Sequence, residues 1–268
     1  ISMRPILFEI YGVPFFAYRT LLAVAFVVCT LLTVRASRTR PGGIEVSPML
    51  GIWAMFGSLA GAHGFFIAQY GDLRDLWRAL FVWEGGLVFY GGLFGGLAAT
   101  AIYLKLCKVP FLNAADSAAP YLAAGEAIAR VGCFLNGCCW GAVCNWPWAI
   151  SFPPDSPAFA QHIADHGLAR SAAHSLPVHP TQLYMVIGLA VICGVLHRAL
   201  FRERPAGLVF FSYVFLYGML RFLVELVRGD SARSVLGLTV SGAISAAFVA
   251  LGIAACAFIV RNPRSLSE

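Results

Sequence analysis

Charge is what this chain has least of. Only 12% of its 268 residues are charged and 59% are hydrophobic, with a mean hydropathy of +0.77. Soluble domains carry about 25% charged residues. The scarcity of charge therefore excludes a soluble globular enzyme, a disordered tail and a fibrous protein. It predicts a polytopic membrane protein, because only a chain that crosses a bilayer several times is this apolar.

Three further absences narrow the class. No basic tract is long enough to indicate nucleic-acid binding, so we interpret the net charge of +6 as positive loops beside an anionic membrane. No internal repeat is visible, which weakens the hypothesis of an inverted-repeat transporter. No Cys-x-x-Cys motif accompanies the eight cysteines, so a thioredoxin-like redox motif is missing.

Seven apolar runs predict transmembrane helices. The predicted fold is an all-α integral membrane protein with about seven transmembrane helices, in a single bundle over residues 1–268. Small residues recur in the glycine-rich segment 85–96, a pattern typical of helices that approach closely. The seven runs lie at 14–34, 48–70, 85–106, 113–135, 181–199, 206–228 and 236–260.

The loops between these runs differ in basic residues. One set holds ten lysines and arginines, and the other holds six spread over a greater length. The positive-inside rule makes the first set cytoplasmic, so the N-terminus is outside and the C-terminus inside. The long 136–180 loop then lies on the outer, periplasmic face. Its prolines and tryptophans predict partial order, and we expect its histidines, including His162 and His166, to be solvated.

Charged residues inside the predicted spans are the most informative ones. An arginine at the bilayer centre costs roughly 2.5–3.5 kcal/mol on insertion scales, so such residues pair or line a wet cavity. Glu126 and Arg130 are four residues apart, as are Arg221 and Glu225, which places each pair on one helix face. Each pair either only locks the register of a helix or belongs to a functional site.

The depth of the polar residues within the predicted spans favours a functional site over simple register locks. In the predicted topology, polar residues from five segments share one level in the outer leaflet, whereas independent register locks need not. The pattern predicts one amphiphilic cavity, and its guanidinium groups are suited to a lipid phosphate, which they bind bidentately. The residues at this level are Tyr18, Tyr90, Arg130, Asn136, the segment 179–184, Arg221 and Glu225.

Motifs at these residues occur in order along the whole chain. Residues 86–93 read GLVFYGGL, residues 129–141 read ARVGCFLNGCCWG, residues 179–184 read HPTQLY and residues 217–225 read YGMLRFLVE, while Tyr18 precedes Arg19 in the first span. Here the sequence resembles the prolipoprotein diacylglyceryl transferase family of bacteria. One such motif is weak, but four or five in order at the expected spans form a specific resemblance.

The resemblance implies a seven-span enzyme of the bacterial inner membrane that uses no metal or cofactor. It would transfer the diacylglyceryl group of phosphatidylglycerol to the lipobox cysteine in the signal peptide of a preprolipoprotein, forming a thioether and releasing glycerol phosphate. Arg130 and Arg221 would hold the lipid phosphate, and Glu225 would orient Arg221. Further substrate contacts would come from Tyr18, Tyr90, Asn136, Gly141 and Gln182.

The chain departs from the family pattern at positions that are expected to accept or donate protons. Cys133 replaces an asparagine of the signature, Cys138 replaces its glutamate and Tyr90 replaces the histidine of the third span. The substrate thiol must lose its proton, because thiolate is the nucleophile. Tyr90 is a poor base at neutral pH, since an unperturbed tyrosine has a pKa near 10. The alternatives are His179 and the phosphate itself.

Four cysteines support rival hypotheses. Cys133, Cys138, Cys139 and Cys144 lie within twelve residues at the predicted outer face. They would form structural disulfides, remain plain thiols, or make a redox relay or metal site, although their spacing matches zinc motifs poorly. The rival functions are a membrane thiol-disulfide oxidoreductase, an inactive or redirected family member, and a lipid transporter.

Overall fold

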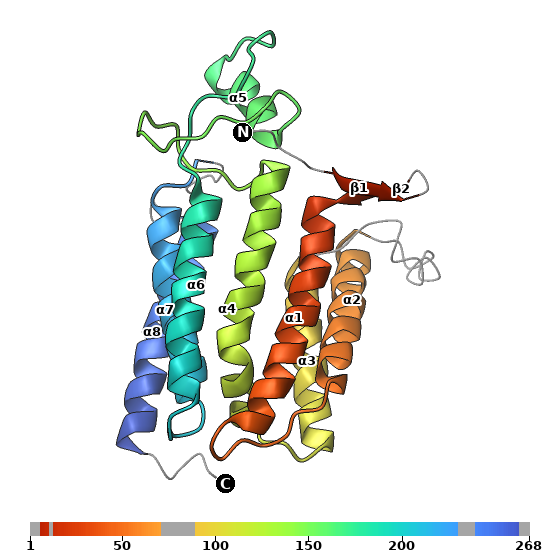
Figure 1. Cartoon of the computed structure of the whole chain (residues 1–268), viewed down its shortest axis with the longest axis vertical. Coiled ribbons are helices and arrows are strands. Elements are labelled where there is room, and N and C mark those ends of the chain that lie inside the picture. Colours follow the sequence, from red (N-terminus) through yellow and green to blue (C-terminus); the bar gives the residue numbers. More distant parts are fainter. Residues whose placement is uncertain (1–5, 11–12, 71–88, 230–238, 263–268) are drawn as a thin grey trace. The chain divides into compact units, whose positions relative to one another are not determined.

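The computed structural model describes residues 6–10, 13–70, 89–229 and 239–262. These residues form eight helices and one two-stranded antiparallel sheet (Figure 1). The strands are β1 (Ile6–Ile10) and β2 (Val13–Phe16). The helices are α1 (Ala17–Thr39), α2 (Met49–Tyr70), α3 (Phe89–Leu106), α4 (Phe111–Asn136), α5 (Pro157–His166), α6 (Thr181–Leu200), α7 (Leu208–Glu225) and α8 (Val240–Arg261).

A helix occupies each of the seven predicted apolar runs. The first run begins later than predicted, because residues 13–16 form β2, and α1 continues to Thr39. Residues 85–88 and 236–238 of two predicted runs lie outside the described residues. The hairpin β1–β2 and the short helix α5 had no counterpart in the predicted set of spans.

Five helices, α1, α2, α6, α7 and α8, are long and apolar enough to cross a membrane. The apolar helix Gly91–Leu106 within α3 is shorter, and α4 carries Asp116, Glu126 and Arg130. Large apolar side chains on the spans point outward, among them Phe56, Ile187 and Val260, each more than 60% exposed. Large apolar side chains exposed along many helices indicate contact with lipid or protein. The chain is therefore a multi-pass helical membrane protein.

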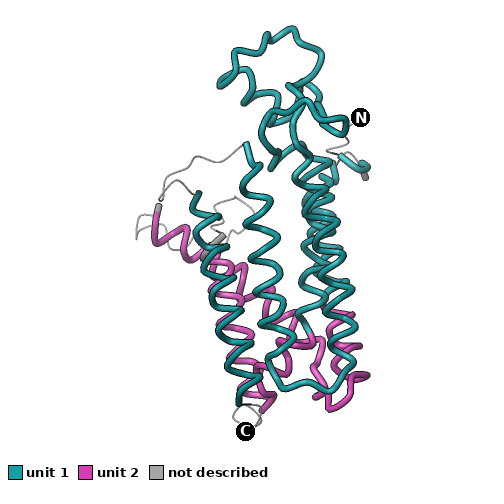
Figure 2. The backbone as a smooth tube through the Cα atoms, turned by 90° about the vertical axis from the view of Figure 1, so that its left-hand side faces the viewer, with its two compact units in different colours: residues 1–29, 118–268 teal, residues 30–117 magenta. Residues whose placement is uncertain are grey.

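The described chain separates into two compact units, shown in different colours in Figure 2. The smaller unit, Thr30–Ser117, contains α2 and α3. These helices pack through glycines: a Cβ on Gly61 would meet the backbone of Gly91 and Gly95. The glycine-rich segment thus packs helices closely, as its spacing predicted.

The larger unit, Ile1–Cys29 with Ala118–Glu268, contains the first half of α1, most of α4, and α5 to α8. It also contains residues 137–180, which we call the outer segment after their predicted position. Glycines again allow close approach: a Cβ on Gly132 of α4 would lie 3.1 Å from Tyr18 Cα in α1, and one on Gly252 of α8 would lie 2.7 Å from Phe215 N in α7. One end of this unit holds the first residues of α1, α6 and α8 and the last residues of α4 and α7 (Figure 1).

The outer segment is ordered, as its composition predicted. Ser156 caps α5 by accepting a hydrogen bond from Phe159 N at 3.2 Å, and Gly167 ends the helix with φ +63°. A small core of Trp140, Phe152, Ala158 and Val178 holds the segment together. Backbone bridges pair Val143 and Ile150 with Val178, and Gly141 with Arg228 beyond α7.

Candidate functional site

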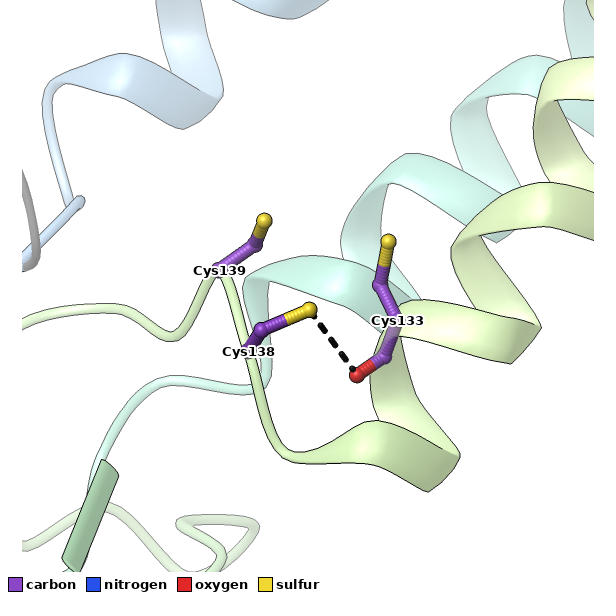
Figure 3. Close-up of side chains that lie close together, drawn as sticks. All are labelled: Cys133, Cys138 and Cys139. Carbon is purple, nitrogen blue, oxygen red and sulfur yellow. Dashed lines mark hydrogen bonds between the residues drawn. The ribbon is translucent and has the colours of Figure 1, made fainter. Parts of the chain in front are cut away.

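The C-terminal end of α4 is where the cysteines come together. Gly137 takes a left-handed conformation with φ +68°, its N–H donates to Phe134 O at 3.2 Å, and Cys138 N donates to Cys133 O at 3.2 Å. These two bonds define a Schellman motif, which reverses the chain. The reversal places Cys138 and Cys139 beside Cys133, with all three sulfurs within 4.8 Å of one another (Figure 3). We call these residues the cysteine trio.

The backbone of the trio is held by α6. Thr181 Oγ1 donates to Cys139 O at 2.6 Å, and Gln182 Nε2 donates to Cys138 O at 2.7 Å. Both α6 side chains are buried, and Gln182 Oε1 has no hydrogen-bond partner among the described residues. Cys139 itself has φ +63°, a conformation that is uncommon for a residue other than glycine and costs on the order of 1–3 kcal/mol. These anchors compensate for that strain.

All eight cysteines, each of them described, are free thiols, so the disulfides considered from the sequence are not formed. Cys139 lies beyond the end of α4. Hydrogen bonds from Cys133 and Cys138 lower the pKa of the Cys139 thiol, and the positive charges of Arg228 and Arg130 act in the same direction. The trio therefore favours one thiolate, held next to guanidinium groups.

Arg130 lies on α4 and is oriented by Glu126, one turn earlier. Its Nη2 donates to Glu126 Oε1 at 2.8 Å and its Nε donates to the same oxygen at 3.3 Å. The Tyr217 hydroxyl of α7 donates to that oxygen as well, at 3.3 Å. Both predicted partners are thus paired, and α7 contributes a third group from a distant part of the chain.

Arg221 lies on α7 and is oriented by Glu225, one turn later. Its Nη1 is 2.7 Å from Glu225 Oε2, and its Nη2 donates to Ser241 Oγ of α8 at 3.1 Å. Thr239 Oγ1 donates to Glu225 Oε1 at 2.6 Å, and Arg228 Nε lies 3.9 Å from Oε2. The carboxylate therefore joins α7 to the start of α8 and holds two guanidinium groups.

These groups form one electrostatic cluster. The positive charges of Arg130 and Arg221 act electrostatically on Tyr217. The charges of Arg228 and Arg130 act in the same way on Arg221. Three arginines face two carboxylates, which leaves one excess positive charge. We call this set the arginine–carboxylate cluster: Arg130, Arg221, Arg228, Glu126 and Glu225. A phosphodiester carries one negative charge, so the cluster matches a phospholipid headgroup in charge.

An aromatic rim lies where the outer segment meets α6. His179 Nδ1 is 3.1 Å from the Tyr184 hydroxyl, which accepts a hydrogen bond from Trp148 Nε1 at 2.8 Å. The indole of Trp146 packs against the His179 ring, with centroids 6.1 Å apart. His179 is thus fixed in orientation by its neighbours.

Gly141 lies beneath this rim. A Cβ there would come within 2.6 Å of His179 Cβ and 2.8 Å of the carbonyl oxygens of His179 and Val227. The structure thus gives Gly141 a packing position between two backbone segments, next to the residues that were predicted to bind substrate.

The predicted site residues divide between the two units. Arg130, Arg221 and Glu225 lie in the larger unit and belong to the arginine–carboxylate cluster. Gln182 and Asn136 lie in the same unit: Gln182 donates to the carbonyl of Cys138, and Asn136 is the last residue of α4.

Tyr18, also in the larger unit, is the second residue of α1, and 39% of its surface is exposed. Tyr90 is the second residue of α3, in the smaller unit, and its side chain lies outside the described residues.

Four residues of the site were not among the predicted site residues. Arg228 follows Glu225 by three residues and Tyr217 precedes Arg221 by four, so helical spacing pointed to both. Thr239 and Ser241 begin α8 and carry no such signal, because hydroxyl residues are common at helix starts.

The outer segment holds a pocket of about 200 Å³ lined by Trp140, Gly141, Ala142, Val143, Gln161, His162, Asp165, His166 and Gly229. The prediction of a solvated His162 was wrong, because its side chain packs against Trp140 and accepts a hydrogen bond from Leu176 N. Burial lowers the pKa of His162, and the neighbouring His166 lowers it further.

The fold and the cluster define a class: a multi-pass membrane protein with oriented arginines at one end of its helices. Its sequence matches the family model described as prolipoprotein diacylglyceryl transferase over residues 5–258. The chain belongs to the prolipoprotein diacylglyceryl transferase family.

Three bacterial relatives illustrate the match, each named phosphatidylglycerol–prolipoprotein diacylglyceryl transferase. The Nostoc sp. protein is 29% identical over 100% of this chain and 93% of its own length. The Clostridium tetani protein is 28% identical over 94% and 96%. The Paenarthrobacter aurescens protein is 31% identical over 93% and 80%.

Proposed function

We propose that this protein transfers the diacylglyceryl group of phosphatidylglycerol to the lipobox cysteine of preprolipoproteins. Family membership supports this reaction over a thiol-disulfide oxidoreductase or a lipid transporter. The observation that carries it to this chain is the arginine–carboxylate cluster, whose single excess positive charge suits one phosphodiester. The substrates are then phosphatidylglycerol and the signal peptide of a preprolipoprotein, met in the bilayer.

Arg130 and Arg221 bind the lipid phosphate in this proposal. Each guanidinium is oriented by a carboxylate four residues away, and each has five N–H donors, more than these protein contacts use. During transfer a C–S bond forms and the C–O bond to phosphate breaks, so negative charge grows on the leaving glycerol phosphate. Oriented guanidinium groups stabilise that charge most in the transition state.

The polar residues beside the cluster hold the rest of the headgroup and the peptide. Asn136, Gln182 and Tyr18 contribute contacts to substrate, and Gly141 keeps the outer segment close to α6 and α7. Tyr90 and His179 stay the candidates for receiving the thiol proton, and His179 is the one with an oriented ring.

The membrane arrangement is part of the proposal. Seven helices span the bacterial inner membrane as one domain, with the N-terminus outside, the C-terminus inside and residues 136–180 at the periplasmic face. Two native cysteines test this. Cys144 belongs to the outer segment, and Cys107 is exposed between α3 and α4. In intact spheroplasts, a membrane-impermeant maleimide should label Cys144 and spare Cys107; the reverse result contradicts the orientation.

The function is tested in detergent with phosphatidylglycerol, a lipobox peptide and purified protein, using mass spectrometry of the peptide thiol. We expect a diacylglyceryl mass shift that disappears in Arg130→Ala and Arg221→Ala proteins that still insert. Phosphatidylethanolamine is the control lipid, because its zwitterionic headgroup would leave the excess charge uncompensated. Thioether formation that survives in either arginine variant contradicts the assigned phosphate site.

A further inference from the structure

The transferase reaction as proposed leaves the cysteine trio without a role. Two of its members, Cys133 and Cys138, stand where the family signature has asparagine and glutamate. The sequence spacing matched zinc motifs poorly, but the reversal after α4 places the three sulfurs within 4.8 Å of one another (Figure 3). In a tetrahedral zinc site with Zn–S bonds of about 2.3 Å, sulfurs lie roughly 3.8 Å apart. Adjustments of the order of 1 Å therefore suffice.

We propose that Cys133, Cys138 and Cys139 bind one zinc ion and leave its fourth position open for the incoming lipobox thiol. Metal binding stands independently of the transferase, whereas the role of the metal rests on the proposed function. Three protein ligands with one open position is the arrangement of catalytic zinc, while structural zinc is closed by four.

The local charge favours a divalent ion. Zn²⁺ cancels two of the three negative charges that three thiolates would bring to the trio, so the occupied site carries only one. Arg130 and Arg228 act electrostatically on Cys139, so the two clusters are neighbours. A monovalent copper ion would leave two negative charges in the same place, so zinc fits better than Cu⁺.

The surroundings are built to hold ligands. Thr181 and Gln182 fix the carbonyls of Cys139 and Cys138, as outer partners do around metal ligands. Gln182 is 99% buried, and its Oε1 is an acceptor with no partner among the described residues, on the same amide that bonds to Cys138. Buried acceptors are normally satisfied, so a water or thiol bound beside the trio would complete the site.

A bound zinc ion would also explain how the substrate thiol loses its proton in a chain that has Tyr90 at the position of the family histidine. A thiol that coordinates zinc loses its proton, here to water, so Tyr90 need not act as a base. The zinc-bound sulfur then donates an electron pair to the glyceryl carbon and forms the C–S bond. The C–O bond breaks, and its electron pair leaves with the phosphate oxygen of glycerol phosphate. No atom is oxidised or reduced.

The first experiment measures metal rather than activity. Protein purified without chelators should contain one zinc per chain, and replacement by Co²⁺ should give a thiolate-to-cobalt charge-transfer band. Cys133→Ser, Cys138→Ser and Cys139→Ser should each lose the band, while the matched control Cys144→Ser keeps it. Adding a lipobox peptide should shift the cobalt spectrum, and the same peptide with serine for cysteine should not.

The outcomes separate the two proposals. Two results overturn the metal site. One is zinc-free protein in which all three trio thiols react with maleimide, and the other is active protein in which the trio is oxidised to a disulfide. Transfer activity that persists after the metal is removed overturns the role of zinc and leaves the proposed function standing. A cobalt spectrum that responds to the cysteine peptide, in protein without transfer activity, supports the metal site and contradicts the transferase.

Discussion

Replacing Arg221 by lysine keeps the charge and removes the fork of the guanidinium. In the structure Arg221 Nη1 contacts Glu225 and Nη2 donates to Ser241, so two directions are occupied before any lipid binds. A lysine has one nitrogen and cannot hold both partners and also grip a phosphate with two parallel hydrogen bonds. We therefore expect Arg221→Lys to lose one charge-assisted hydrogen bond to the lipid phosphate.

Such a bond contributes about 1.5–3 kcal/mol. At about 1.4 kcal/mol for each factor of ten, the loss lowers kcat/KM for phosphatidylglycerol roughly 10- to 150-fold. Arg221→Ala is less informative, because it also removes the closer of the two guanidinium groups that pair with the buried Glu225 carboxylate, at about 3–5 kcal/mol of stability. The lysine variant should keep a melting temperature near that of the wild type, which a thermal-shift measurement in detergent checks.

Arg38→Lys is the matched control. Arg38 Nη2 lies 2.8 Å from Glu45, a similar ion-pair distance, but the two side chains are 52% and 68% exposed. Exposed pairs contribute about 0–1 kcal/mol, so the control should transfer as the wild type does. An Arg221→Lys protein with wild-type kcat/KM and stability would refute the argument that the guanidinium fork grips the phosphate.

Three further predictions follow from the geometry. Glu126→Gln should lower kcat/KM more than Tyr217→Phe, because the carboxylate accepts from both Arg130 and Tyr217, while the tyrosine gives up one 3.3 Å hydrogen bond of about 0.5–1.5 kcal/mol. Gly141→Ala should lower the melting temperature, because its Cβ would meet two backbone carbonyls, whereas Gly64→Ala, with open space around it, should not. Stability should fall as pH drops below about 6.5, because the lowered pKa of His162 means that unfolded chains bind more protons; His162→Asn should flatten this pH dependence of the melting temperature.

Each of these has a clear contrary result. Equal losses in the Glu126 and Tyr217 variants would mean that the carboxylate does not orient Arg130. A Gly141→Ala protein as stable as the Gly64→Ala control would show that the outer segment shifts to admit a methyl group. A His162→Asn protein with unchanged pH dependence would show that His162 does not cause the loss of stability at low pH.

Helix positions and ion pairs were accessible from local spacing. The apolar runs predicted seven helices because hydropathy is a property of consecutive residues, and the four-residue spacing of Arg130 with Glu126 and of Arg221 with Glu225 predicted both contacts. The predicted solvation of His162 failed for the opposite reason. Its burial depends on packing against Trp140, which no local pattern encodes.

The amino-acid sequence alone was sufficient for the membrane class, the helices, the family resemblance and the two arginine pairs, since each depends on residues within a few turns of one another or on ordered motifs. Only the tertiary structure joined Thr239 to Glu225, and the end of α4 to α6 across 42 and 44 residues. The same holds for the cysteine trio. Its spacing argued against a metal site, and the left-handed turn at Gly137 brought the three sulfurs together, because a chain reversal brings side chains close that linear spacing keeps apart.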